Sequence, residues 1–126
     1  MIVTDKRVVE FVEKKIGRRI YPPYTSMGWE RNGEVVAGCI FNCWEPGEDI
    51  ELTVAAERGA ITRGYLRAMG RYVRDQLGCY RASMTTTQAE VIDICERLGG
   101  EVEGRREIAP GKYKYLLGIT KDNWKF

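Results

Sequence analysis

Several residues that can bind an anion gather in one short segment of this 126-residue chain. Arg58 and Gly59 follow an apolar run, and Thr62, Arg63 and Gly64 open a long amphipathic segment. The first N–H groups of a helix have no partner inside the helix, and the helix dipole favours negative charge there. An apolar strand that turns through glycine into a helix is therefore typical of a phosphate-binding site.

A general base must come from the carboxylates, because the chain contains no His. This absence removes the commonest general base and every Ser-His or Cys-His pair. Glu51 interrupts the apolar run that ends at Val54. A charge on a strand covered on both faces is costly unless it is paired or functional. Glu51 is thus the candidate base, and a solvated face of the strand is the alternative interpretation.

The composition argues against several classes of function. With 20 basic and 18 acidic residues, the chain has no excess of charge for a broad nucleic-acid surface. No apolar run approaches the roughly 20 residues that span a bilayer. The four cysteines form no CxxC pair, which argues against a zinc site and is typical of free thiols in a cytoplasmic protein. We expect one domain over 1–126, with no metal and no membrane contact.

Apolar periodicity predicts the elements that position these residues. Asn32-Gly33 between two extended runs is typical of a hairpin with a type I′ turn, which needs positive φ at both residues. The expected order is a helix over 4–16, the two hairpin strands, a third antiparallel strand over 50–55, a helix over 62–77, a strand over 79–84, a helix ending at Leu98, and two strands separated by Pro110-Gly111.

Three features of spacing along this order resemble those of a known family. Val54 lies ten positions before Gly64, Gly64 lies fourteen before Gly78, and Glu96-Arg97-Leu98-Gly99 closes the last helix. Over roughly residues 26–120 the chain resembles the GCN5-related N-acetyltransferase superfamily. The resemblance implies an α/β fold of the α+β kind, in which helices flank a predominantly antiparallel mixed sheet.

The resemblance also implies binding of acetyl-coenzyme A. In the family, N–H groups of a Gln/Arg-x-x-Gly-x-Gly/Ala turn hold the pyrophosphate, and the preceding strand pairs with the pantetheine arm. Only Gly64 matches a glycine of that motif, whereas Thr62 stands at the first glycine, where its hydroxyl could cap the helix or donate to a phosphate. The cofactor-binding residues implied are Val54, Arg58, Gly59, Ala60, Thr62, Arg63, Gly64 and Gln88.

The catalytic residues match the family less well. Many members use a Tyr on the last helix as general acid, and the matching position here is Cys95. Its thiol is a candidate acid, but a small buried residue on the apolar face of that helix is the favoured interpretation. The function implied is transfer of an acetyl group from acetyl-coenzyme A to a small-molecule or peptide amine, with the oxyanion held by a backbone N–H near Val54.

Two other functions stay open. Some phage-encoded proteins of this fold modify nucleobases in DNA, and a compact chain with one N-terminal helix suits a phage origin, although the near-neutral charge argues against a nucleic-acid partner. The third interpretation is a non-catalytic domain that binds coenzyme A or a protein partner. It is suggested by the departures from the family pattern at Thr62, Cys95 and Gly100. The resemblance also suggests a homodimer, which is common in the family.

Overall fold

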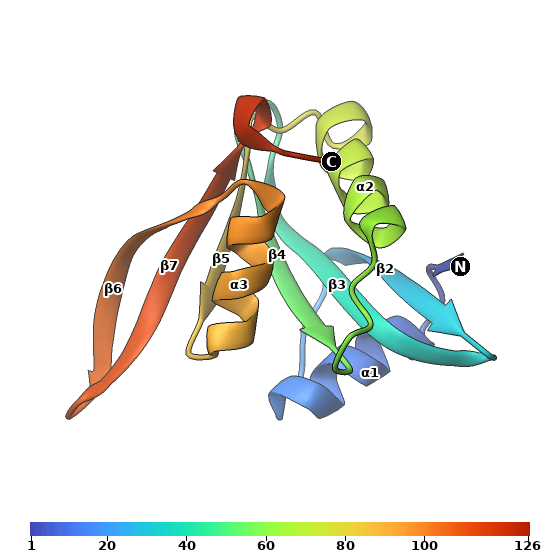
Figure 1. Ribbon diagram of the computed structural model, residues 1–126, viewed down its shortest axis with the longest axis horizontal. Coiled ribbons are helices and arrows are strands. Elements are labelled where there is room, and N and C mark those ends of the chain that lie inside the picture. The colour runs from blue at the N-terminus through green and yellow to red at the C-terminus, as the bar shows by residue number, and fades with distance from the viewer.

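The computed structural model describes residues 1–126 as one mixed sheet with helices on both faces (Figure 1). The strands are β1 (Ile2–Val3), β2 (Tyr24–Arg31), β3 (Glu34–Glu45), β4 (Asp49–Ala56), β5 (Arg81–Thr86), β6 (Glu101–Ala109) and β7 (Lys112–Thr120), and the helices are α1 (Arg7–Ile16), α2 (Arg63–Arg71) and α3 (Ala89–Leu98). The strand order is β1-β2-β3-β4-β5-β7-β6. Only β4 and β5 pair in parallel.

The α/β class and the predominantly antiparallel mixed sheet predicted from the sequence are confirmed. Asn32 and Gly33 both have positive φ, 53° and 82°, as the predicted hairpin turn requires. The helix predicted over 62–77 is α2 followed by one π-helical turn, Tyr72–Gln76. The pattern does not predict β1, because two residues are too few to show a period.

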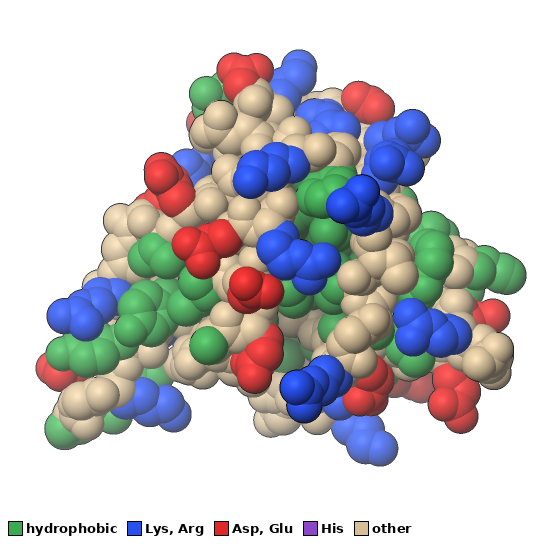
Figure 2. All heavy atoms as spheres, viewed as in Figure 1, with side chains coloured by type: hydrophobic (Ala, Val, Ile, Leu, Met, Phe, Trp, Pro, Cys, Tyr) green, Lys and Arg blue, Asp and Glu red, His purple; other side chains and the backbone are tan.

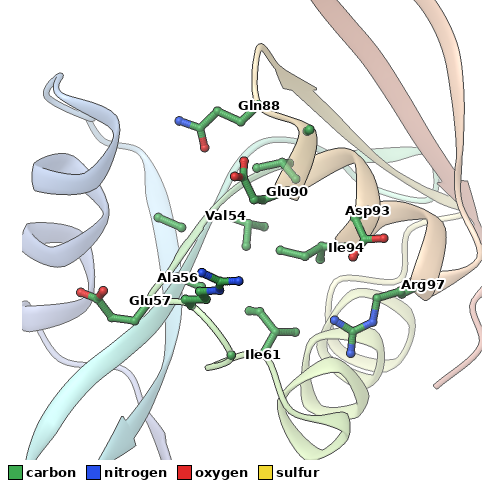
Figure 3. A pocket seen from close by; sticks show the side chains of 14 residues that line it. Val54, Ala56, Glu57, Ile61, Gln88, Glu90, Asp93, Ile94 and Arg97 are labelled. Atoms are coloured by element: carbon green, nitrogen blue, oxygen red, sulfur yellow. The ribbon is translucent and has the colours of Figure 1, made fainter.

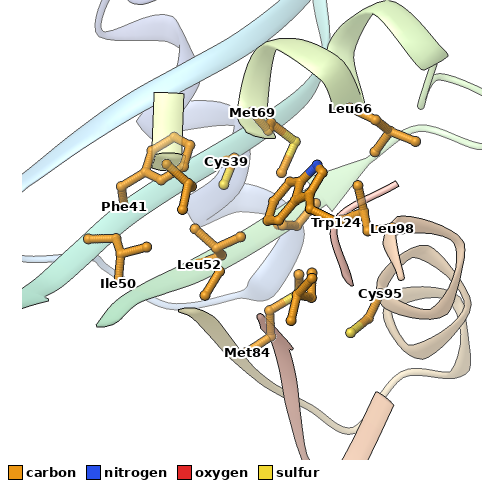
Figure 4. Packing of buried hydrophobic residues seen from close by; sticks show 14 of the residues in the cluster. Cys39, Phe41, Ile50, Leu52, Leu66, Met69, Met84, Cys95, Leu98 and Trp124 are labelled. Atoms are coloured by element: carbon orange, nitrogen blue, oxygen red, sulfur yellow. The ribbon is translucent and has the colours of Figure 1, made fainter. Parts of the chain in front are cut away.

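Two apolar clusters hold the helices against opposite faces of the sheet. The larger cluster, shown in Figure 4, lies between the sheet and helices α2 and α3, and includes Phe41, Leu52, Met69 and Leu98. The smaller cluster joins α1 to the other face of β3 and β4. The helices α2 and α3 therefore lie together on one face, and α1 lies alone on the other.

The C-terminal tail ties α2 to α3. Trp124 is 9% exposed and packs directly against Gly70 of α2. The N–H of Lys125 donates to the carbonyl oxygen of Leu98 at 2.8 Å, and the guanidinium of Arg74 donates to the oxygen of Phe126 at 3.0 Å. These contacts fix the distance between the two helices that share a face.

Close contact between α1 and the sheet depends on glycine. A Cβ at Gly38 of β3 would lie 2.7 Å from a methyl group of Val12. Gly38→Ala is therefore expected to lower the free energy of unfolding by about 1–3 kcal/mol, and adding Val12→Ala should recover part of this loss. Urea unfolding of the single and the double variant measures the loss and its recovery. The control is Gly104→Ala, because a Cβ there meets only ordinary contacts at 3.7 Å; equal losses at both glycines would contradict the explanation.

Candidate functional site

The two parallel strands separate soon after they pair. β4 is paired with β5 only from Asp49 to Glu51, although β4 continues to Ala56. Figure 1 shows the two strands diverging, with α3 in front of the gap between them. Beyond Glu51, β4 is paired only with β3, so one edge of its backbone has no neighbouring strand.

This free edge carries the N–H groups of Val54 and Ala56. The N–H of Glu57 donates to the carbonyl oxygen of Val36 at 2.8 Å and therefore points toward β3. Successive residues of an antiparallel strand turn their backbone groups to alternate edges. The N–H groups of Ala56 and Val54 consequently point away from β3 and into the gap.

A cavity of about 990 Å³ lies in front of this edge, between β4, the loop that follows it and α3 (Figure 3). Val54, Ile61 and Ile94 point toward one another across it and belong to its apolar lining. Arg97 extends from α3 toward α2 at one end of the cavity. The cavity is thus apolar near β4, and its charged lining comes from Glu57 and Arg58 of the loop and from Glu90, Asp93 and Arg97 of α3.

Half of the residues implied by the resemblance line this cavity, and half lie beside it. Val54, Arg58, Gly59 and Gln88 line the cavity. Ala60 is buried, and Arg63 and Gly64 are exposed at the start of α2. The structure therefore brings the first four residues together and leaves Ala60, Thr62, Arg63 and Gly64 outside the cavity lining.

Thr62 begins α2 as its N-cap. Its hydroxyl oxygen accepts the N–H of Tyr65 at 3.1 Å, which is one of the two roles expected from the sequence. Because the oxygen accepts in this bond, the hydroxyl proton is free to donate to an anion. Thr62 thereby stabilises the helix whose N-terminus points toward the loop of Arg58.

The start of α2 has the charge pattern of an anion site. Its first turn contains no acidic residue, and Arg58, Arg63 and Arg67 have no ion-pair partner. Basic side chains gather over α2 and acidic ones over α3 in Figure 2. A negative group would therefore be drawn to the α2 end of the cavity.

A smaller cavity of about 160 Å³ opens toward the face that carries α1. It is lined by Arg18, which follows α1, by Thr53 of β4 and by Lys114 of β7. The two cavities share Val54, Gln88 and Val91. They therefore meet where β4 and β5 separate.

Glu51 lies at the point of separation but lines neither cavity. It is half-buried, and its neighbour Thr53, on the same face of β4, lines the smaller cavity. A hydrogen bond to the Glu51 carboxylate, together with its charge, raises the pKa of the exposed Cys43 thiol. Glu51 therefore lies beside Cys43, two residues before Thr53 of the smaller cavity.

Cys95 is enclosed in the larger apolar cluster. It is 0% exposed, lines no described cavity, and has a pKa raised to about 11, chiefly by burial. Figure 4 shows its side chain directed from α3 into the packed residues. This placement supports the packing role that the sequence favoured.

Sequence reasoning missed Arg18, Arg97 and Lys114, which line the two cavities. They lie on three different segments, after α1, on α3 and on β7, far along the chain from the glycine-containing loop, and no local pattern marks them. Nowhere do three or more His, Cys, Asp or Glu side chains gather as metal ligands would. None of the helices combines the length and apolar character of a membrane span.

No protein-family model matches the chain, and no curated protein does. The chain is similar to solved structures across most of its length. It matches the N152L mutant of spermidine N-acetyltransferase SpeG from Vibrio cholerae with a TM-score of 0.70 and 9% identity, over 97% of this chain and 94% of that chain. It matches an acetyltransferase of the GNAT family from Streptococcus pneumoniae with a TM-score of 0.70 and 12% identity, over 95% of this chain and 98% of that chain. At identities of 9% and 12%, this similarity shows a shared fold and nothing more.

Proposed function

The chain has the fold of the GCN5-related N-acetyltransferases, and from this fold we propose that it transfers an acetyl group from acetyl-coenzyme A to an amine. The observation that carries the proposal is the free edge of β4. It faces a cavity of about 990 Å³ and leads directly to the N-terminus of α2. A long ligand with amides at one end and phosphates at the other needs these two features side by side.

The β4 edge of the cavity and the start of α2 fit the chemistry of coenzyme A, whereas the α3 wall carries the carboxylates of Glu90 and Asp93. The N–H groups of Val54 and Ala56 suit the amides of an extended arm, which can pair with a free strand edge as another strand would. The N-terminus of α2 and the side chain of Arg58 suit a pyrophosphate. Gln88 lies on the opposite wall and can bond an amide of the arm. When bound, acetyl-coenzyme A would supply the activated acetyl thioester.

In this proposal Val54 has the central role in transfer. Val54 lines both cavities, so its N–H lies where an acyl donor on one side and an amine on the other can meet. A fixed backbone donor at that point stabilises negative charge as it develops on the carbonyl oxygen. Glu51, two residues earlier on β4, accepts the proton of the amine through a water molecule in this proposal.

Calorimetric titration of the purified protein with acetyl-coenzyme A tests the proposal. Binding is expected, and pantetheine, which lacks the pyrophosphate, should bind more weakly because the start of α2 and Arg58 would have no anion to hold. The absence of binding at millimolar acetyl-coenzyme A would exclude an acetyltransferase. Equal binding of the two ligands would remove the phosphate site from the proposal.

A second candidate, a domain that binds coenzyme A without catalysis, is favoured by one observation: neither Glu51 nor Cys95 lines a cavity. Glu51→Gln separates the two functions. In an acetyltransferase that uses this base, the substitution should lower transfer by roughly 100-fold or more and leave coenzyme A binding unchanged. Rates with an amine panel and calorimetry provide the measurement. The exposed Glu48→Gln is the matched control; equal rates in all three proteins would remove Glu51 from the mechanism.

We also propose a cytoplasmic location, where the four free cysteines would remain reduced. Modification of a nucleobase in DNA remains the alternative reaction of the same site. Mass spectrometry of nucleosides from cells that express the protein distinguishes the two, since an acetylated nucleoside would appear only if nucleic acid is the acceptor.

A further inference from the structure

The smaller cavity has a charge that restricts what can enter it. Arg18 and Lys114 are the charged side chains of its lining, and no carboxylate lines it. Neither residue forms an ion pair within the protein. The remaining polar side chains of the lining are hydroxyls and one amide, which can donate hydrogen bonds to an anion.

The sheet beside this cavity adds a third unpaired cation. Arg106 of β6 lies directly opposite Lys114 of β7, so the two side chains project from the same face of the sheet. Like charges placed directly opposite each other destabilise a strand pair. Arg106 forms no ion pair that would offset this repulsion. Arg18 and Lys114 of the lining, and Arg106 opposite Lys114 on the sheet, thus have no ion-pair partner within the chain.

From this arrangement we propose that the acceptor is a small amine that carries its own anionic group, a phosphate or a carboxylate. The inference rests on the proposed acetyl transfer. The cavity of about 160 Å³ is smaller than the roughly 300–1,000 Å³ of pockets that enclose a whole drug-sized ligand. Only the amine end of the acceptor enters it, and the anionic group stays at the mouth beside Arg18 and Lys114.

The same charges disfavour a polyamine. A polycation in this cavity would meet Arg18 and Lys114, with Arg106 opposite Lys114, and no carboxylate of the lining would bind it. Glu51, the proposed base, also lies outside the lining. Neighbouring positive charges also favour the neutral form of an amine, which is the form that attacks a thioester. The acceptor preference therefore differs from that named for the spermidine enzyme of Vibrio cholerae.

Binding to the coenzyme A-loaded protein tests the inference without depending on turnover. The probes are phosphoethanolamine, β-alanine, ethanolamine and spermidine, at low and at raised salt. The two anionic amines should bind at least about tenfold more tightly than ethanolamine, and added salt should reduce the difference. The comparison of phosphoethanolamine with β-alanine shows which anion the site takes. Transfer of acetyl groups to the same amines should follow the same order.

Charge reversal at the cavity is the second arm of the test. Arg18→Glu with Lys114→Glu should abolish the preference for anionic amines and raise the affinity for spermidine. Arg31→Glu with Lys121→Glu is the matched control, because both residues are exposed, unpaired and outside the described cavities. Tighter binding of spermidine by the unmodified protein, or an anionic preference that survives the reversal, would overturn the inference and leave acetyl transfer standing. Failure of coenzyme A to bind would overturn both.

Discussion

Val54→Pro is expected to lower the rate of acetyl transfer by about two to three orders of magnitude, the usual effect of removing one oxyanion donor. Proline has no N–H, and the N–H of Val54 points into the gap between β4 and β5. Because this N–H is not part of the ladder with β3, the sheet should tolerate the ring as an edge strand does. Steady-state rates, with thermal unfolding as a check on folding, provide the measurement.

Ala56→Pro is the matched control for this substitution. It removes an N–H from the same free edge, but Ala56 lines only the larger cavity. It should therefore weaken coenzyme A binding and leave the rate at saturating coenzyme A largely intact. If both variants lowered that rate equally, or if Val54→Pro retained most of it, the assignment of Val54 as the oxyanion donor would be wrong.

Trp124→Ala is expected to lower the free energy of unfolding by about 3–5 kcal/mol, the usual cost of truncating a buried aromatic residue. The indole fills the space beside Gly70, and the tail that carries it bonds α2 and α3. The loss should appear as a lower midpoint in urea at an unchanged slope. Since α3 lines the larger cavity, coenzyme A should partly restore the midpoint, as a ligand of the folded state does.

Trp44→Ala removes the same number of atoms from a different setting. Trp44 is 53% exposed, and its indole N–H donates to the carbonyl oxygen of Leu77 at 3.0 Å. Loss of one exposed hydrogen bond should cost about 1 kcal/mol. A larger loss from Trp44→Ala than from Trp124→Ala would contradict the role assigned to the tail.

Local features of the fold could be predicted from the sequence because each depends on neighbouring residues. Asn32-Gly33 marks its turn, since few residue pairs adopt positive φ at both positions. Gly78 and Gly99 end their helices in the left-handed conformation, with φ of 65° and 104°. The period of two in β2 and β3 and the helical period in α3 likewise depend on short stretches of chain.

The candidate site was only partly predictable, because its parts come from distant segments. Val54, Arg58 and Gly59 belong to one strand and its loop, and the sequence places them together. Arg18 and Lys114 lie 96 positions apart by their numbers and meet only because α1 and β7 flank the same gap. The separation of β4 from β5 leaves no mark in either strand, since an unpaired edge and a paired edge have the same side-chain period.

The alternative for Glu51, a solvated face, could not be settled from the sequence for a related reason. Alternation predicts that Glu51 and Thr53 share a face, but it does not tell what covers that face. In the structure Thr53 lines the smaller cavity and Glu51 lies just outside it. Thr53, which lines the cavity, and Glu51, which is half-buried outside it, are therefore only two residues apart on β4.

A crystal structure of the protein with coenzyme A tests the central claim most directly. We expect the pantetheine arm along the free edge of β4, the thiol sulfur beside the N–H of Val54, and the pyrophosphate at the N-terminus of α2. The sulfur should also face the smaller cavity lined by Arg18 and Lys114. Coenzyme A bound elsewhere, or a thiol pointing away from the gap between β4 and β5, would contradict the account.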